Sequence, residues 1–203
     1  MIAIIDYGVG NLFSLVSSFS CIGKDAELTS DVDKIKKADR IILPGVGAFA
    51  DARKKLSDSG LDRVVVEEAR SGKPLLGICL GMQMLFEKSF EYGEHEGLGL
   101  IKGSVRPMRE VIPGDLKIPQ MGWNALKFIG EKNELFKYVK EGDFVYFVHS
   151  YHGTDCDASL IATTEYGTQI TAAVASGNVY GTQFHPEKSG EVGLSILRAF
   201  CEI

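Results

Sequence analysis

The chain has little of several features that define other classes of protein. Only four of its 203 residues are cysteines, and no two of them form a CxxC pair, so neither a disulfide framework nor a cysteine-rich zinc site is predicted. No apolar run approaches the roughly 18 residues that a membrane span requires. These absences predict a cytoplasmic protein with free thiols and no membrane association, in which at most one cysteine has special chemistry.

Positive charge is also scarce. The chain has 22 Lys and Arg residues against 27 Asp and Glu residues, a formal net charge of -5, and no basic stripe, which argues against nucleic-acid binding. Its four histidines are scattered without metal-ligand spacing, so we expect no metal and no cofactor. The opening residues MIAIIDYGVGN lack a basic segment and a cleavage site, and they predict a buried strand rather than a signal peptide.

The first half of the chain alternates apolar runs with helical spacings. Strands are expected at residues 2–5, 41–43 and 74–78, and helices at residues 11–22, 48–56 and 61–70, with a short helix through Lys37 that Ser30 or Asp31 can cap. Continuous apolar strands separated by helices predict a parallel sheet covered on both faces. Ligand sites in such sheets lie beyond the carboxyl ends of the strands.

The second half is built from shorter strands separated by glycine and proline. We expect strands near residues 103–108, 124–128, 144–148, 160–164, 170–175 and 179–184, and a closing helix at about residues 191–202. This pattern predicts an antiparallel extension of the same unit. The length fits one domain over residues 1–203.

Cys79 is the strongest candidate for a nucleophile. It lies between Gly77 and Gly81, after an apolar strand and before a helical pattern, which is the arrangement of a nucleophile elbow with cysteine in place of serine. The glycines permit a sharp turn, the helix N-terminus favours the reactive thiolate, and the N–H of Leu80 points to where an oxyanion would form. Alternatively, Cys79 is a small buried hydrophobe.

A base and its orienting carboxylate occur together near the end of the chain. Pro186 favours an extended His185, and side chains two apart in an extended segment point the same way. Glu187 can therefore fix the imidazole tautomer while His185 takes the proton of Cys79. The alternative is a surface turn that carries both residues by chance.

The other histidines are weaker candidates for the base. His95 lies in a polar segment and is expected to be solvated. His149 and His152 flank residues 150–151 in a loop and can line a pocket, but no carboxylate lies at the right spacing.

Together these motifs resemble the class I, triad-type glutamine amidotransferases. The match is carried by GICLGMQ at residues 77–83 and FHPE at residues 184–187, in the order and at the separation typical of that family, and it extends over essentially the whole chain. The resemblance implies a flavodoxin-like α/β fold, with a mostly parallel central sheet, helices on both faces and a small antiparallel extension.

The resemblance also implies a reaction and the roles of individual residues. The Cys79 thiolate would attack the side-chain amide of L-glutamine, giving a thioester and ammonia, and water would release glutamate. Backbone N–H groups would hold the oxyanion, and a second group of residues would hold the amino-acid end of the substrate. The oxyanion residues implied are Gly45, Val46, Gly47 and Leu80; the substrate residues are Gln83, Ser150 and Tyr151. For Gln83 the alternative is an exposed helix residue.

Three further segments resemble one branch of the family, which supplies ammonia for imidazole glycerol phosphate in histidine biosynthesis. They are PGVGAF at residues 44–49, PQMGWN at residues 119–124 and HPEKS at residues 185–189. The resemblance implies a heterodimer with a (β/α)8-barrel cyclase, and this chain is too short to hold such a barrel of about 250 residues. Gln120 departs from the histidine expected there, which leaves its role open.

The surface that would meet this partner has four candidate residues, namely Asn11, Met121, Trp123 and Lys188. Trp123 is alternatively a core residue, Lys188 a free surface charge and Asn11 a helix cap. We also expect residues 45–47 to reorient a peptide plane when the partner docks, because glycine tolerates both signs of φ. That hypothesis predicts low glutaminase activity for the isolated chain.

Three other functions stay open from the sequence. A nucleotide-binding module is suggested by the GxGxxA match at residues 45–50, although it lies on a later strand than usual. A cysteine hydrolase or peptidase would use Cys79 and His185 equally well. The third alternative is a glutaminase subunit for another synthase, and only the three branch segments distinguish it from the branch named above.

Overall fold

The computed structural model describes residues 1–10 and 12–203, so the candidate Asn11 lies outside the described residues. The first half contains β1 (Ile2–Ile5), α1 (Leu12–Cys21), β2 (Ala26–Thr29), α2 (Val32–Lys37), β3 (Arg40–Leu43), α3 (Phe49–Asp58), α4 (Leu61–Arg70), β4 (Leu75–Ile78), α5 (Leu80–Leu85), β5 (Phe86–Ser89), β6 (His95–Glu96) and β7 (Ile101–Pro107). The second half contains η1 (Met108–Glu110), β8 (Gln120–Phe128), η2 (Glu134–Phe136), β9 (Phe144–His149), β10 (Tyr151–Thr154), β11 (Leu160–Glu165), β12 (Gln169–Ser176), β13 (Val179–Thr182), η3 (Pro186–Lys188) and α6 (Gly190–Phe200).

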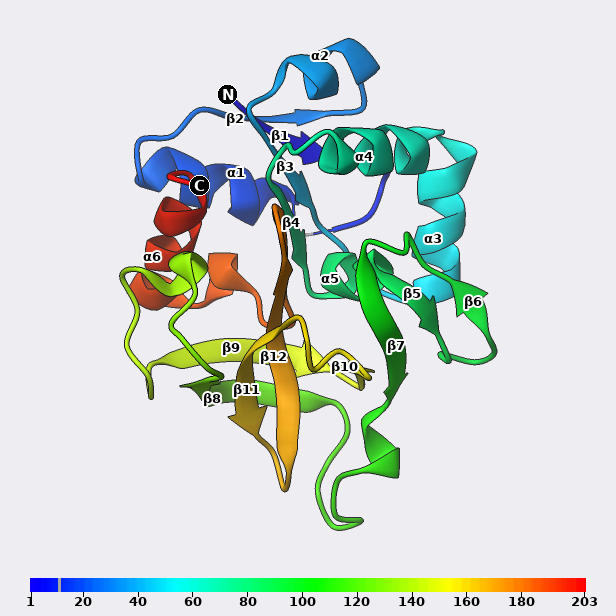
Figure 1. Ribbon diagram of the computed structural model, residues 1–203, viewed down its shortest axis with the longest axis vertical. Coiled ribbons are helices and arrows are strands. Elements are labelled where there is room, and N and C mark those ends of the chain that lie inside the picture. Colours follow the sequence, from blue (N-terminus) through cyan, green and yellow to red (C-terminus); the bar gives the residue numbers. More distant parts are fainter. Residues whose placement is uncertain (11) are drawn as a thin grey trace.

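A large mixed sheet forms the centre of the molecule (Figure 1). Its strand order is β2-β1-β3-β4-β13-β12-β11-β8-β9, and the first five strands are parallel in a flavodoxin-like arrangement. The remaining strands continue the same sheet in antiparallel pairs. A smaller sheet has the order β10-β7-β5-β6. The predicted α/β class is therefore confirmed.

The register of β13 decides where the functional residues meet. This strand is the last in the chain, yet it pairs in parallel with β4, and Thr182 lies opposite Ile78. Both strands therefore end at the same edge of the sheet. Their next residues are Cys79 on one side and the segment leading to His185 on the other.

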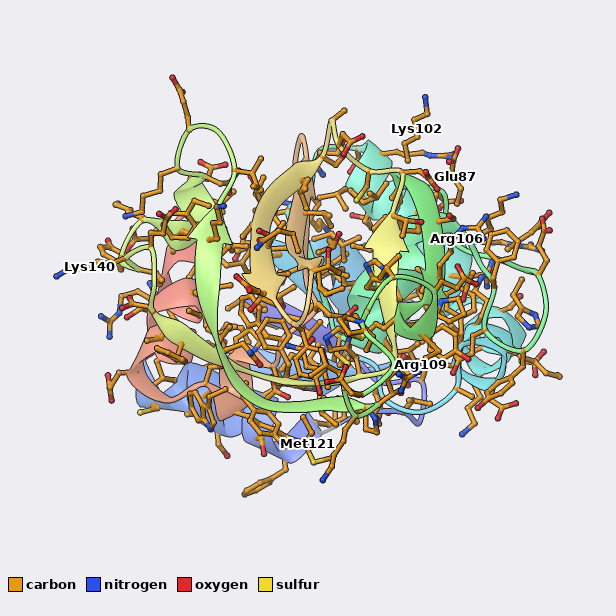
Figure 2. All side chains as sticks on the ribbon, turned by 90° about the horizontal axis from the view of Figure 1, so that it is seen from below. Glu87, Lys102, Arg106, Arg109, Met121 and Lys140 are labelled. Carbon is orange, nitrogen blue, oxygen red and sulfur yellow. The ribbon has the colours of Figure 1, made fainter. Side chains whose placement is uncertain are left out.

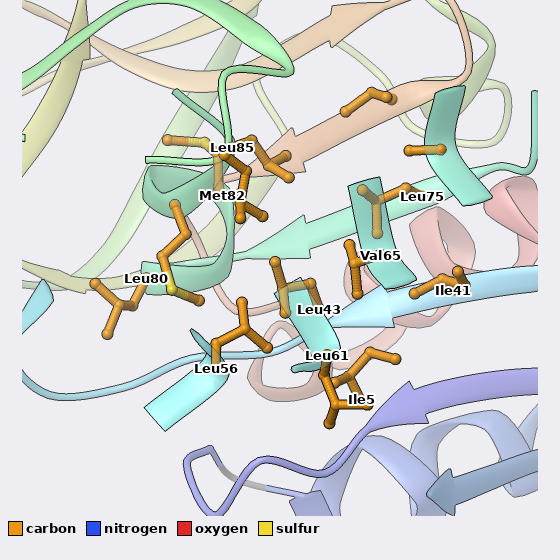
Figure 3. Packing of buried hydrophobic residues seen from close by; sticks show 14 of the residues in the cluster. Ile5, Ile41, Leu43, Leu56, Leu61, Val65, Leu75, Leu80, Met82 and Leu85 are labelled. Carbon is orange, nitrogen blue, oxygen red and sulfur yellow. The ribbon is translucent and has the colours of Figure 1, made fainter. Parts of the chain in front are cut away.

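Buried side chains fill both faces of the parallel half. Along β1, Ala3 and Ile5 pack with α2, α3 and α4, whereas Ile2 and Ile4 pack with α1 and α6. This alternation follows from the two-residue period of a strand. Figure 3 shows part of the first layer, in which Leu56, Leu61 and Val65 cover the strands.

Several local expectations were wrong. β2 was missed because its AELT sequence is only partly buried and shows no continuous apolar run. The helix after Cys79 ends at Leu85, and the chain continues into β5 and β6. The strand expected over residues 179–184 ends at Thr182.

Candidate active site

Cys79 occupies a strained turn between β4 and α5. Its backbone has φ 54° and ψ -111°, a conformation that residues other than glycine rarely adopt. A Cβ on Gly77 would lie 2.7 Å from the carbonyl oxygen of Gly81, and a Cβ on Gly81 would overlap the carbonyl oxygen of Leu43. Both positions therefore require glycine, and the strain is concentrated at the candidate nucleophile.

His185 and Glu187 form a buried pair beside this turn. Nδ1 of His185 lies 2.8 Å from Oε1 of Glu187, and each side chain is only 2% exposed. His185 itself is extended, but residues 186–188 form a 3₁₀ turn, so the expectation of a continuous extended segment was wrong. The turn, rather than strand geometry, brings the carboxylate to the imidazole.

The electrostatics of His185 favour its charged form. Burial lowers the pKa of the imidazole, but the neighbouring Cys79 sulfur and the Glu187 carboxylate outweigh burial and raise the pKa to about 10. Nε2 of His185 is buried, and no hydrogen bond of ordinary geometry satisfies it within the described part of the chain. The nitrogen is therefore available to a reacting group near Cys79.

Most of the predicted site residues surround one cavity of about 500 Å³. Those that line it are Val46, Gly47, Cys79, Leu80, Gln83, Ser150, Tyr151 and His185. Glu187 lies behind His185. The cavity thus brings together the loop after β3, the turn after β4, α5, the β9–β10 connection and the segment that follows β13.

The predicted oxyanion segment lies against the elbow. A Cβ on Gly45 would be 2.8 Å from the backbone nitrogen of Gly81 and 3.0 Å from Cβ of Leu80, so only glycine permits this approach. Gly47 has φ +93°, and a Cβ there would meet nothing within 4 Å. Leu80 is the first residue of α5, where a backbone N–H lacks a partner within its own helix.

Gln83 is buried, and its amide nitrogen is already occupied. Nε2 donates to the carbonyl oxygen of Tyr151 at 3.1 Å and to Oε1 of Gln183 at 3.0 Å. Nε2 of Gln183 in turn donates to the sulfur of Cys79 at 3.7 Å. Sequence reasoning gave Gln183 no role, although its position two residues before His185 was a usable signal.

Glu91 is a second residue that the sequence did not reveal. It lines the cavity, is 9% exposed, and accepts a hydrogen bond of 2.7 Å from the backbone N–H of Phe49 at the start of α3. Burial raises the pKa of its carboxyl group. The only sequence signal was a glutamate two residues before a glycine in a polar loop, which is too common to be informative.

Two further histidines are buried in a neutral state. Nδ1 of His149 lies 2.7 Å from the carbonyl oxygen of Tyr151, so it carries the proton and Nε2 is an acceptor. Burial lowers the pKa of His149 to about 4 and that of His152 to about 4. The expectation that His149 lines a pocket is correct, whereas His152 lies in β10 and is not among the residues that line the cavity.

These neutral histidines make stability depend on pH. Between pH 6.5 and about 4 these two histidines bind more protons in the unfolded chain than in the folded chain, so their contribution to the free energy of unfolding falls as the pH drops. His152→Leu removes one such group and two buried ring nitrogens without partners in the described structure. We expect it to raise the free energy of unfolding at pH 5 by about 1–3 kcal/mol and to weaken the acid dependence. Urea unfolding at pH 5 and pH 7, with His95→Leu as control, measures both; equal effects at the two pH values would contradict this account.

Three of the candidate partner residues are exposed on one surface. Met121 is 64% exposed and Trp123 is 52% exposed, so the alternative of a core tryptophan is wrong. Trp123 contacts Tyr146 edge-on at a ring distance of 6.0 Å, and Nζ of Lys188 lies 5.9 Å from the same ring. Figure 2 shows Met121 projecting from the molecule at this side.

Within residues 1–10 and 12–203, no group of three or more His, Cys, Asp or Glu side chains is arranged to hold a metal ion. None of the described helices combines the length and the apolar character needed to span a bilayer.

A family model described as glutamine amidotransferase class-I matches residues 3–202. The chain therefore belongs to the class I glutamine amidotransferases. Among curated relatives, it is 49% identical to the imidazole glycerol phosphate synthase subunit HisH of Oceanobacillus iheyensis, over 100% of this chain and 99% of that protein. It is 46% identical to the subunit of the same name from Wolinella succinogenes, over 100% of both chains. Within its class, the chain thus belongs to the HisH family, the glutaminase subunits of imidazole glycerol phosphate synthase.

Solved structures support the fold at lower sequence identity. A glutamine amidotransferase crystal structure superposes with a TM-score of 0.77 at 17% identity, covering 100% of this chain and 98% of that one. PurLQS from Thermotoga maritima gives a TM-score of 0.75 at 19% identity, with coverage of 99% and 97%. These structures confirm the fold, while the family match and the curated relatives confirm the class and the branch predicted from the motifs.

Proposed function

We propose that this chain hydrolyses L-glutamine in the cytoplasm through a Cys79–His185–Glu187 triad and delivers the ammonia to a (β/α)8-barrel cyclase. The single observation that carries the proposal is the parallel pairing of β13 with β4. This pairing brings a strained cysteine and a buried His–Glu pair to one cavity.

In this mechanism His185 holds the proton of Cys79 as an imidazolium, and the thiolate attacks the carboxamide carbon of glutamine. The Leu80 N–H and an N–H from residues 45–47 receive the oxyanion. His185 protonates the leaving nitrogen, ammonia departs, and the γ-glutamyl thioester forms on Cys79. His185 then takes a proton from water, which attacks the thioester, and glutamate leaves.

The cavity also offers groups for the amino-acid end of glutamine. With its nitrogen occupied, Gln83 presents Oε1 as an acceptor, and Glu91 adds a carboxylate on the same wall. Both suit the α-ammonium group of the substrate. The backbone at Ser150 and Tyr151 is the proposed contact for the α-carboxylate.

The partner would bind the exposed residues Met121, Trp123 and Lys188 together with the half-buried Tyr146, and we call these four residues the docking patch. This surface is linked directly to the catalytic base, because the backbone N–H of His185 donates to the carbonyl oxygen of Tyr146 at 3.0 Å. Movement of β9 on docking would therefore reach His185. Gly45 is packed tightly, so the proposed reorientation would be confined to the peptide between Val46 and Gly47.

The proposal is tested by assaying glutamate and ammonia release from the isolated chain and from the complex recovered by pull-down. We expect slow hydrolysis alone and a marked increase with a barrel-shaped cyclase bound. Absence of hydrolysis in both samples would refute the proposed activity. Full activity of the isolated chain would refute only the coupling to residues 46–47.

Trp123→Ala is expected to weaken binding of the cyclase about tenfold or more, since exposed tryptophans at interface centres carry much of the binding energy. Titration calorimetry with the purified partner measures the change. Val32→Ala is a suitable control, because Val32 is also exposed but lies in α2, at the opposite end of the molecule (Figure 1). Equal affinity of the Trp123 variant and the unmodified chain would exclude Trp123 from the interface.

A further inference from the structure

Gln183 is a wholly buried amide beside the candidate nucleophile. It follows β13, and its backbone N–H donates to the carbonyl oxygen of Ala172 at 2.8 Å, which fixes the main chain at this point. Its side chain contacts Cys79 on one side and Gln83 on the other. Nothing in the triad mechanism requires an amide in this place.

The orientation of the Gln183 amide is fixed by a chain of hydrogen bonds. The chain starts at the carbonyl oxygen of Tyr151, which can only accept and which receives Nδ1–H of His149 and Nε2–H of Gln83. The second N–H of Gln83 then needs an acceptor, and Oε1 of Gln183 provides it at 3.0 Å. The NH₂ group of Gln183 must therefore face the sulfur of Cys79, 3.7 Å away.

This geometry distinguishes the two protonation states of the sulfur. The carbonyl oxygen of Val148, 3.9 Å from the sulfur, can accept a hydrogen bond from a thiol but has no hydrogen to donate to a thiolate. An N–H donor has the opposite preference, because hydrogen bonds to a charged acceptor are the stronger kind. Gln183 thus opposes Val148 and favours the ionised nucleophile.

We propose that Gln183 is a further catalytic residue, whose side-chain N–H holds the Cys79 thiolate and whose orientation is set through Gln83 by the substrate-binding loop at Tyr151. This inference rests on the proposed function in that it takes Cys79 as the nucleophile. It adds a route by which a ligand contacting Gln83 or residues 150–151 alters the reactivity of the sulfur.

The test uses two variants of the full-length chain. Gln183→Met keeps the approximate size but removes the N–H group, and Gln183→Glu keeps the shape but replaces the donor with an acceptor. The rate of alkylation of Cys79 by iodoacetamide is followed across the neutral pH range by mass spectrometry of the Cys79 peptide. We expect alkylation at pH 7 to slow about 10- to 100-fold in both variants, with the pH profile moved to higher pH. Gln169→Met, at the exposed first residue of β12, is the matched control and is expected to leave the profile unchanged.

Glutamate release separates a catalytic role from a structural one. If Gln183 acts on the sulfur, kcat falls by a similar factor while KM for glutamine changes less than about threefold. An unchanged alkylation profile in a folded Gln183 variant overturns the proposal. If neither variant folds, Gln83→Met decides, since it leaves the donor in place but removes its anchor; an unchanged profile there also overturns the proposal. Failure of the unmodified chain to release glutamate even with its partner bound counts against the proposed function instead, because the alkylation profile is measured without substrate.

Discussion

Cys79→Ser is expected to reduce glutamine hydrolysis by at least about 10³-fold while leaving the fold intact. The hydroxyl of serine is a far weaker nucleophile than the thiolate. In addition, His185 loses the neighbouring sulfur that favours its charged form. Glutamate release by the purified chain with its partner measures the effect. Binding of glutamine is expected to survive, because the groups proposed for its amino-acid end are untouched.

The matched control is Cys21→Ser, an exposed cysteine in α1. It is expected to hydrolyse glutamine at the unmodified rate. If the Cys79 variant kept more than a few per cent of the activity, a different nucleophile would have to be sought. If the two variants lost activity equally, the effect would be on folding rather than chemistry.

The second large effect is expected from a single methyl group at the elbow. Gly81→Ala would place a Cβ atom so close to the carbonyl oxygen of Leu43 that the two would overlap, where the first turn of α5 contacts the end of β3. Neither atom belongs to a flexible side chain, so the backbone itself must move. We expect a loss of about 3 kcal/mol or more in the free energy of unfolding, and loss of hydrolysis in whatever fraction folds.

Urea unfolding monitored by circular dichroism checks this expectation, with Gly114→Ala as the control. A Cβ on Gly114 would meet nothing within 4 Å, and its backbone is not in the left-handed region. The control is therefore expected to unfold within about 1 kcal/mol of the unmodified chain. Equal stability of the two variants would mean that the backbone at the elbow moves to accept the added Cβ at no cost, which would contradict this prediction.

The residues of the proposed triad could be selected from the sequence because they lie in short local segments with recognisable patterns. Two glycines around Cys79 identify a sharp turn after an apolar strand, and His185 and Glu187 are neighbours in sequence as well as in space. The flavodoxin-like half was predictable for a similar reason, since β1, β3 and β4 are continuous apolar runs. In each case the information lies within a few residues of the feature.

The parts that could not be predicted depend on distant contacts. The role proposed for Gln183 depends on Gln83, which lies 100 residues earlier in the sequence and fixes the orientation of the Gln183 amide. Glu91 enters the cavity through its bond to α3 rather than through any pattern around it. The smaller sheet was missed because β5 and β6 are short and polar, and their pairing is decided by packing rather than by intrinsic preference.

The position of β13 has a consequence for synthesis of the protein. A ribosome-bound chain that has not yet reached Val179 already contains the elbow, but β4 then has an open edge where β13 will lie. Exposed apolar strand edges invite pairing with other chains. Synthesis of β13 and of the segment that follows it therefore has two effects: it covers the open edge of β4 in the central sheet, and it brings His185, the proposed base, beside Cys79. A chain that terminates before Val179 is therefore prone to aggregation, and it lacks the base that we propose for glutamine hydrolysis.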